Sequence, residues 1–354
     1  MTDDQVFKGN GIRVGNGPDI PPPPSWRAFG RSSETGASSD GTAESGNLST
    51  PPNEELSDGS LAPISDQTAV WTMNAAIMLR RPLLVTGPPG AGKTTLARMV
   101  AAELGLGRVL RWSITSSTRL VDGLYHYDAI GWVQHQSRAS GGSRREDRVQ
   151  QARAIGRYLR LGPVGTALLP WCRPRVLLID EIDKADIDLP NDLLHVFEEG
   201  QFEIPELFRL DDDVRREVDV FTDDRGRRSA DGRLEIPTRT VHDGVVRCYE
   251  FPVVVLTSNG ERTFPPAFLR RCLPLKLDLP DAAQLTAIID RRIPRASDRL
   301  RDAAIARFQE GLKRGDTLAV NQLLNAVHIL SAQGRVGVDQ QGTIFDRLMA
   351  KLDE

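Results

Sequence analysis

The chain has 354 residues, with 45 Lys and Arg against 48 Asp and Glu, 40% hydrophobic residues and a formal net charge of -3 at pH 7. This length suits roughly two folded domains, and the near-neutral charge argues against a dedicated nucleic-acid binder, which neutralises phosphates with an excess of cations. Three widely spaced cysteines favour neither disulfides nor a zinc site, and there is neither a membrane-length apolar run nor a signal peptide, so we expect a cytoplasmic protein.

The first part of the chain, residues 1–62, is dominated by Gly, Pro, Ser, Asp and Asn. Such a composition cannot bury enough apolar surface to offset its chain entropy, so we expect a disordered tail. Within it, residues 20–29 combine four prolines with Trp26 and Phe29. This stretch is either a docking peptide for a partner or a Pro-rich spacer.

Residues 63–279 alternate between strand and helix patterns. Short apolar runs predict five strands, at 83–86, 108–114, 175–180, 252–258 and 273–277. Helical spacing of apolar residues predicts helices over 66–81 and 95–104. The alternation favours an α/β fold, in which a parallel sheet is flanked by helices. Two connections are long enough to be insertions, over about 131–170 and 211–244. The first is arginine-rich, which suits either an anionic partner or a solvated helix.

The remaining residues, 280–354, carry no strand pattern. Helical spacing separated by Pro or Gly predicts four helices, over 282–291, 297–313, 318–332 and 343–352. We therefore expect a separate all-helical domain at the C-terminus.

The strongest motif is Gly-Pro-Pro-Gly-Ala-Gly-Lys-Thr at residues 87–94, which matches the phosphate-binding pattern G-x-x-x-x-G-K-[ST] between a predicted strand and helix. The glycines let backbone N–H groups surround an anion, and the helix N-terminus adds a positive dipole end. Lys93 is expected to reach the β- and γ-phosphates, and the Thr94 hydroxyl to ligate Mg²⁺. The predicted nucleotide contacts are Gly87, Pro88, Pro89, Gly90, Ala91, Gly92, Lys93, Thr94, Thr95 and Asp180.

Two adjacent acids, Asp180 and Glu181, follow an apolar strand at the edge where parallel sheets bind ligands. We expect Asp180 to hold Mg²⁺ and Glu181 to polarise the attacking water, as a hydrolase requires. Next to them, Asp183 and Lys184 suit a structural pair. Asn259 ends the next buried strand and can either orient the lytic water or form a turn.

These three strand ends, followed by a helical region, resemble the AAA+ ATPases over about residues 66–335. The segment Leu-Leu-Ile-Asp-Glu-Ile-Asp-Lys-Ala at residues 177–185 is similar to the corresponding sequence of the MoxR and dynein-related branch. The resemblance implies a P-loop fold with a helical lid, ATP and Mg²⁺ as ligands, and ATP hydrolysis. It identifies residues 87–94 as Walker A, Asp180 and Glu181 as Walker B, and Asn259 as sensor 1.

The resemblance also implies a homo-oligomeric ring, a hexamer, in which a neighbouring subunit inserts an arginine beside the γ-phosphate. Residues 265–272 resemble that segment: Arg271 matches this catalytic finger best, and Arg270 is expected to bridge to the sheet edge. No arginine occupies the expected sensor 2 place between residues 315 and 321. In the insert after the second strand, Tyr125 and Tyr127 either grip a polypeptide or pack on the adjacent helix.

Three functions remain open from the sequence. The first is a ring ATPase that remodels a protein client, which in the MoxR branch often carries a von Willebrand factor A domain. The second is a regulatory nucleotide switch with slow hydrolysis, which the missing sensor 2 arginine favours. The third is a DNA-acting motor driven by GTP or ATP that uses the arginine-rich insertion, which the near-neutral charge disfavours. None of the three needs a membrane.

Overall fold

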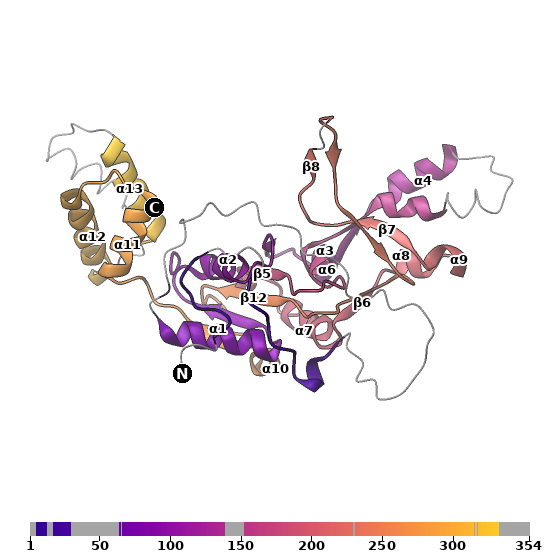
Figure 1. Ribbon diagram of the computed structural model, residues 1–354, viewed down its shortest axis with the longest axis horizontal. Coiled ribbons are helices and arrows are strands. Elements are labelled where there is room, and N and C mark those ends of the chain that lie inside the picture. Colours follow the sequence, from indigo (N-terminus) through magenta and orange to yellow (C-terminus); the bar gives the residue numbers. More distant parts are fainter. Residues whose placement is uncertain are drawn as a thin grey trace.

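The computed structural model describes residues 5–12, 17–29, 64, 66–138, 152–228, 231–314, 316 and 318–332. They form a central α/β region, a smaller sheet built from the two insertions, and a C-terminal group of helices. The smaller sheet and the C-terminal helices lie at opposite ends of the α/β region (Figure 1). The predicted helix over 343–352 and most of the arginine-rich stretch lie outside the described residues.

The central sheet has five strands, and all of its pairings are parallel. The strands run in the spatial order β13-β1-β12-β5-β2. Their bounds are β1 (Leu83–Thr86), β2 (Leu110–Ser113), β5 (Val176–Asp180), β12 (Val253–Ser258) and β13 (Leu273–Lys276). The predicted fold class and its five-stranded parallel sheet are confirmed. Because β1, β12 and β5 are neighbours, the loops that follow them meet at one edge of the sheet.

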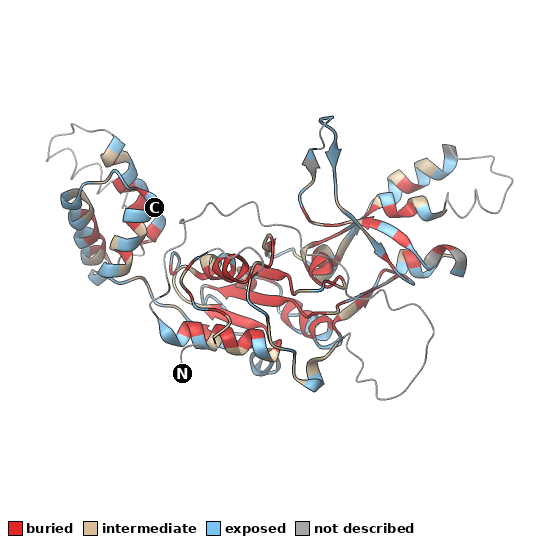
Figure 2. Cartoon of the chain, in the orientation of Figure 1, coloured by how far each residue is buried: buried red, intermediate tan, exposed pale blue. Residues whose placement is uncertain are grey.

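Helices cover both faces of this sheet, and alternate residues of each strand face opposite sides. In β5, Leu178 joins the apolar cluster formed with α1 (Gln67–Leu79) and α2 (Lys93–Glu103), whereas Leu177 joins the cluster on the other face. That second face is covered by α6 (Pro163–Ala167) and α7 (Leu189–Glu199). The buried residues therefore concentrate in the central sheet and the inner sides of its helices (Figure 2).

The two predicted insertions meet in a single four-stranded sheet, which we call the insertion sheet. Its order is β10-β7-β4-β3. The first insertion and the residues before it supply β3 (Tyr125–Tyr127) and β4 (Leu159–Leu161); the second supplies β7 (Val218–Phe221) and β10 (Thr238–Val241). The two halves join where β4 pairs with β7 in parallel, at Arg160 and Phe221.

Short elements surround the insertion sheet and link it to the core. A second antiparallel pair, β6 with β11, lies next to it, and a small hairpin of β8 and β9 extends from it with exposed side chains (Figures 1 and 2). The bounds of these elements are α3 (Leu120–Leu124), α4 (Ala129–Arg138), η2 (Ala154–Tyr158), β6 (Gln201–Glu203), α8 (Pro205–Phe208), α9 (Asp212–Arg215), β8 (Arg227–Arg228), β9 (Leu234–Glu235) and β11 (Val245–Arg247).

A buried ion pair anchors the insertion sheet to the central sheet. The Arg175 guanidinium is fully buried, contacts Asp224 at 2.7 Å and lies over the Trp171 ring. At the other side of the insertion sheet, the Tyr125 hydroxyl donates to Glu206 at 2.8 Å, and its ring stacks on Phe202. Of the two alternatives for Tyr125, the structure therefore supports packing.

The C-terminal part of the described chain folds into α11 (Ala282–Arg292), α12 (Asp298–Lys313) and α13 (Val320–Ala332), close to the predicted ranges. These helices enclose an apolar cluster of their own, which includes Leu285, Ile289, Phe308 and Leu323. Asp281 begins α11 with a capping box to Gln284. None of the described helices combines the length and the hydrophobicity that crossing a bilayer requires.

The described part of the N-terminal segment differs from the disordered tail that its composition predicted. Residues 5–12 lie on the α/β region, with Phe7 fully buried. The Glu103 carboxylate at the end of α2 accepts backbone N–H groups of Lys8, Gly9 and Gly11, at 2.9, 3.0 and 2.7 Å. Both glycines have φ near +68°, which side chains rarely adopt. One buried ring and three charge-assisted hydrogen bonds thus dock a segment whose average composition is polar.

The expected docking peptide also contacts its own chain. Its short helix η1 (Ser25–Arg27) leads to Phe29, which stacks on Phe251 with a centroid distance of 5.0 Å. The Arg27 guanidinium lies over both rings and donates to the Phe197 carbonyl at 3.1 Å. These contacts hold residues 27–29 beside the end of α7.

Replacing Phe7 tests whether the N-terminal segment is part of the fold. Because its ring is fully buried, Phe7→Ala should lower the free energy of unfolding by about 3 kcal/mol in urea denaturation. Ile12→Ala is the matched control, since Ile12 is 60% exposed. Equal stabilities for the two variants would contradict the docked arrangement.

Candidate functional site

The phosphate-binding motif forms the loop between β1 and α2, as the sequence predicted. Gly87, Gly90 and Gly92 have φ values of 153°, 83° and 87°, where residues with a Cβ atom are strained. At Gly87 a Cβ would also lie 2.1 Å from the Leu277 carbonyl oxygen. Helix α2 begins at Lys93, directly after the third glycine, so its N-terminal end faces the loop. The loop therefore has the shape and the dipole direction that favour an anion.

Lys93 is buried and folds back over this loop. Its Nζ donates to the carbonyls of Gly87 and Pro88, at 2.6 and 3.0 Å, and to Oδ1 of Asn259 at 2.8 Å. Burial lowers the pKa of Lys93, while Asp183, Asp180 and Glu181 act in the opposite direction. The amine thus joins the phosphate loop to the end of β12, and it can exchange these neutral acceptors for phosphate oxygens.

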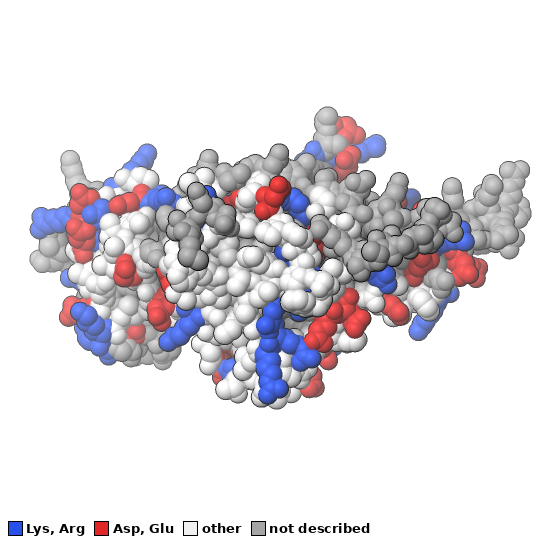
Figure 3. Space-filling view, turned by 60° about the horizontal axis from the view of Figure 1, so that its bottom comes forward, with Lys and Arg blue, Asp and Glu red and all other residues white. Residues whose placement is uncertain are grey.

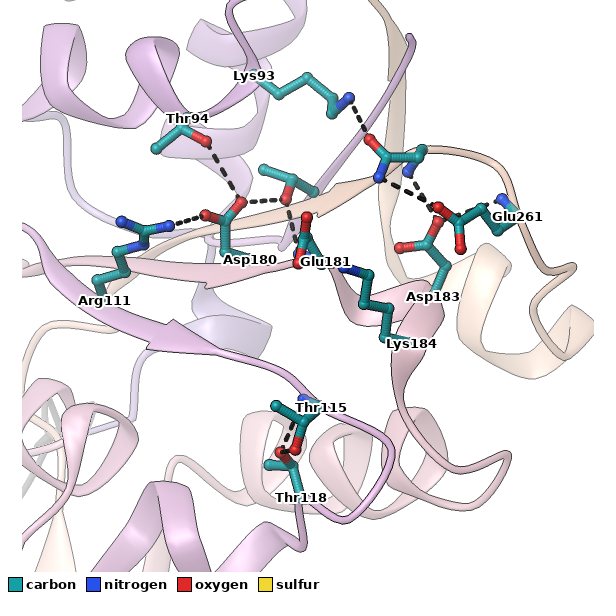
Figure 4. Close-up of polar contacts among 12 residues, drawn as sticks. Lys93, Thr94, Arg111, Thr115, Thr118, Asp180, Glu181, Asp183, Lys184 and Glu261 are labelled. Atoms are coloured by element: carbon teal, nitrogen blue, oxygen red, sulfur yellow. Dashed lines mark hydrogen bonds and ion pairs between the residues drawn. The ribbon is translucent and has the colours of Figure 1, made fainter. Parts of the chain in front are cut away.

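Asp180 lies at the carboxyl end of β5 with its side chain only 10% exposed. Its Oδ1 accepts from the hydroxyls of Thr257 and Thr94, at 2.6 and 3.3 Å. Its Oδ2 accepts from Nη2 of Arg111 on β2 at 2.7 Å. Figure 4 shows Arg111 on the side of Asp180 that faces away from Glu181. Both oxygens of this buried carboxylate are therefore partnered, which burial requires.

Glu181 follows in a left-handed conformation, with φ at 62°, an uncommon value for a residue with a side chain. Its N–H donates to the Thr257 hydroxyl at 2.9 Å, which fixes the turn. Its carboxylate accepts from Lys184 Nζ at 2.8 Å, and this hydrogen bond raises the pKa of Lys184. The expected pairing of Asp183 with Lys184 is wrong, because the turn at Glu181 brings Lys184 to the glutamate instead.

Asp183 instead braces the end of β12. It is 3% exposed, and its Oδ2 accepts the backbone N–H of Asn259 at 2.8 Å and of Glu261 at 3.2 Å. Asn259 is therefore held from both sides, by Asp183 through its backbone and by Lys93 through its side chain. The sequence left open whether Asn259 forms a turn or takes part in the site. The structure is compatible with both, because the turn that Asp183 holds places the Asn259 side-chain amide beside Lys93.

Sequence reasoning missed three members of this network, namely Arg111, Thr257 and the bracing role of Asp183. Arg111 and Thr257 lie inside strands, where only the strand register shows which residues face Asp180. The pairing of β2 with β5 sets Arg111 beside Leu178, two residues before Asp180 and on the same face.

The two candidate finger arginines lie apart from this network, at the end of α10 (Pro266–Arg271). Arg271 forms an ion pair with Glu198 on α7, and its carbonyl accepts from Arg81 at 3.2 Å. We expected Arg270 to bridge to the sheet edge, but among the described residues it is Arg271 that forms an ion pair, and its partner lies on α7. The described side-chain contacts of Arg271 involve α7 and α10, and none involves Lys93, Thr94 or Asp180.

A cavity of about 540 Å³ adjoins the phosphate loop, between that loop and the C-terminal helices. At its inner end the start of α13 approaches the loop so closely that a Cβ on Gly90 would lie 2.7 Å from the Val320 nitrogen. Asn321 lines the cavity where the sensor 2 arginine was expected, and α11 contributes Arg291 and Arg292. The cavity is large enough for the nucleoside part of a nucleotide.

The residues present fit a nucleoside triphosphate with Mg²⁺. The Thr94 hydroxyl and the Asp180 carboxylate are hard oxygen ligands, which Mg²⁺ prefers, and the glycine loop and Lys93 suit phosphate oxygens. Among the described residues no group of three or more His, Cys, Asp and Glu is placed to hold a metal ion by itself. Phosphate oxygens would therefore be needed to complete the coordination of the cation, which would in turn neutralise part of their charge.

The fold and the site define a nucleotide-binding protein of the P-loop class with a C-terminal helical region. The family model of the "ATPase family associated with various cellular activities (AAA)" matches residues 83–275, and the chain belongs to this family. It is accordingly an ATPase. The comparison with curated proteins gave no match. Assignment to the MoxR and dynein-related branch stays a prediction.

Replacement of Lys93 tests the phosphate site. Lys93→Ala removes the side-chain ammonium that, among the described residues, contacts the loop, so binding of a fluorescent ATP analogue should weaken by more than about tenfold. Lys276→Ala is the control, because Lys276 is exposed at the end of β13. Unchanged affinity in Lys93→Ala would contradict the assignment of the loop.

Proposed function

We propose that the chain hydrolyses ATP within a ring of identical subunits and uses the resulting conformational change to remodel a partner protein, as MoxR-like proteins do. The observation that carries the proposal is that the phosphate loop and its acidic residues lie apart from Arg271, the proposed catalytic arginine. The phosphate loop and acidic residues lie at one edge of the sheet, whereas Arg271 contacts α7 instead. Completing the charge around the γ-phosphate then requires the Arg271 of another subunit, which makes turnover depend on assembly.

Within one subunit, the proposed roles follow from the contacts. Thr94 and Asp180 hold Mg²⁺, and Lys93 neutralises phosphate oxygens. Asn259, held by Asp183, orients the water that Glu181 polarises. Glu181 acts after it leaves Lys184, because an ion-paired carboxylate is a weaker base.

The insertion sheet is the proposed client-binding element. It projects from the end of the α/β region opposite the C-terminal helices (Figure 1). The elements attached to it present exposed apolar side chains, among them Ile130 and Val133 on α4 and Leu234 on β9. Such side chains suit a protein client, and the proposed client carries a von Willebrand factor A domain. On the face in Figure 3, basic and acidic groups lie side by side, which supports a protein partner over DNA.

A nucleotide-dependent switch with slow hydrolysis is the second candidate. The Lys184–Glu181 ion pair favours it, since it withholds the proposed base, and so does Asn321 at the place of a sensor 2 arginine. The two functions differ in turnover. A remodelling ATPase gains activity with protein concentration and client, whereas a switch stays slow under both conditions.

Glu181→Gln tests the proposed base. Because glutamine cannot accept a proton but keeps the size of the side chain, the variant should bind ATP normally and hydrolyse it at least about 100-fold more slowly. Phosphate release measures the rate, and analogue fluorescence measures binding. Glu261→Gln is the matched control, since Glu261 is an exposed glutamate beside Asn259. Normal turnover in Glu181→Gln would refute the role.

Mixing two inactive variants tests whether Arg271 acts in trans. Arg271→Ala should lose on the order of 10³ in turnover, while an Arg270→Ala control loses much less. Adding Glu181→Gln subunits, which carry an intact Arg271, should restore part of the activity to the Arg271→Ala active sites. Mixtures that stay as inactive as their components would show that the arginine does not complete a neighbour's site.

A further inference from the structure

The ion pair between Arg111 and Asp180 has no part in the function proposed above. Arg111 reaches Asp180 from β2, the edge strand of the central sheet, with 2.7 Å between Nη2 and Oδ2. The Asp180 side chain is 10% exposed, but that of Arg111 is 52% exposed. The guanidinium therefore lies at the solvent side of a buried carboxylate, where it can move away without disturbing packing.

Arg111 is also the cation that balances this carboxylate. The other partners of Asp180 are the hydroxyls of Thr94 and Thr257, which carry no charge. The nearby lysines are engaged elsewhere, Lys93 on loop carbonyls and Lys184 on Glu181. Among the described residues, no positive group other than Arg111 is in direct contact with this buried carboxylate, and its loss would be unfavourable in a region of low dielectric.

A cation held by Thr94 and Asp180 would lie next to the Arg111 guanidinium. The two positive charges repel each other, and both are attracted to the same carboxylate. We propose that Arg111 occupies Asp180 in the nucleotide-free chain and competes there with Mg²⁺, so that the cation binds only together with the added negative charge of the phosphates. The inference rests on the proposed cation site at Thr94 and Asp180, and it makes Arg111 a positioning residue.

A purely structural pair makes a different prediction. If Arg111 only ties β2 to β5, its removal lowers the melting temperature and leaves cation affinity unchanged. If it competes with the cation, its removal strengthens cation binding, with the largest effect when no nucleotide is present. Cation affinity therefore separates the two roles.

The test uses Mn²⁺ as the probe, followed by electron paramagnetic resonance on the full-length chain with and without a non-hydrolysable ATP analogue. Arg111→Gln should bind Mn²⁺ on the order of tenfold more tightly than wild type in the absence of nucleotide, with a smaller gain in its presence. Arg111→Lys, which keeps the charge, should stay near wild type. Arg119→Gln is the control, because Arg119 also pairs with an aspartate but follows β2 in an exposed loop.

A double variant, Arg111→Gln with Asp180→Asn, separates failure of this inference from failure of the cation site. Loss of the tightened Mn²⁺ binding in the double variant would support the competition. Unchanged affinity in Arg111→Gln, with binding that Asp180→Asn still abolishes, would overturn the inference and keep the cation site. Mn²⁺ binding that is indifferent to Asp180→Asn would overturn both. Thermal unfolding of each variant checks that it is folded.

Discussion

The buried carboxylate of Asp180 is the constraint on which the rest of the site depends. A carboxylate withdrawn from water must be fully hydrogen-bonded, and Asp180 obtains its partners from three separate segments. Thr94 lies in the first turn of α2, Thr257 lies in β12 and Arg111 lies in β2. The same Thr257 hydroxyl accepts the N–H of Glu181 and so fixes its left-handed turn. Satisfying one charge thus aligns the phosphate loop, both acids and the end of β12 before a ligand arrives.

Three cationic side chains that the proposed function uses are paired within the same chain. Lys93 is held by loop carbonyls, Lys184 by Glu181, and Arg271 by Glu198 on the distant α7. Each of these interactions has to be exchanged if the groups are to act as proposed. Nucleotide offers Lys93 better acceptors, and assembly offers Arg271 the phosphate of a neighbour. Under the proposed ring mechanism, these exchanges would make an isolated subunit slow and an assembled one active.

Local sequence patterns were enough to predict much of the fold and part of the site. The five strands are short apolar runs, and the phosphate loop is a contiguous motif whose glycines, lysine and threonine act together, so both were predictable. Arg111 was not, because its contact depends on the register of β2 against β5. The pairing of β4 with β7 and the docking of Lys8 on Glu103, 95 positions away, likewise depend on tertiary structure. Lys184 has two acidic residues nearby in the sequence, Glu181 and Asp183. It pairs with Glu181 because of the left-handed turn at that residue, which the sequence alone does not reveal.

Above all, we infer that the groups around Asp180 and Lys93 form a preorganised binding site for a triphosphate and its cation. A crystal or cryo-EM structure of the full chain with Mg²⁺ and a non-hydrolysable ATP analogue tests it most directly. We expect Lys93 Nζ to leave the carbonyls of Gly87 and Pro88 for phosphate oxygens, with the cation beside Thr94 and Asp180. Phosphates bound elsewhere, with Lys93 still on those two carbonyls, would contradict it.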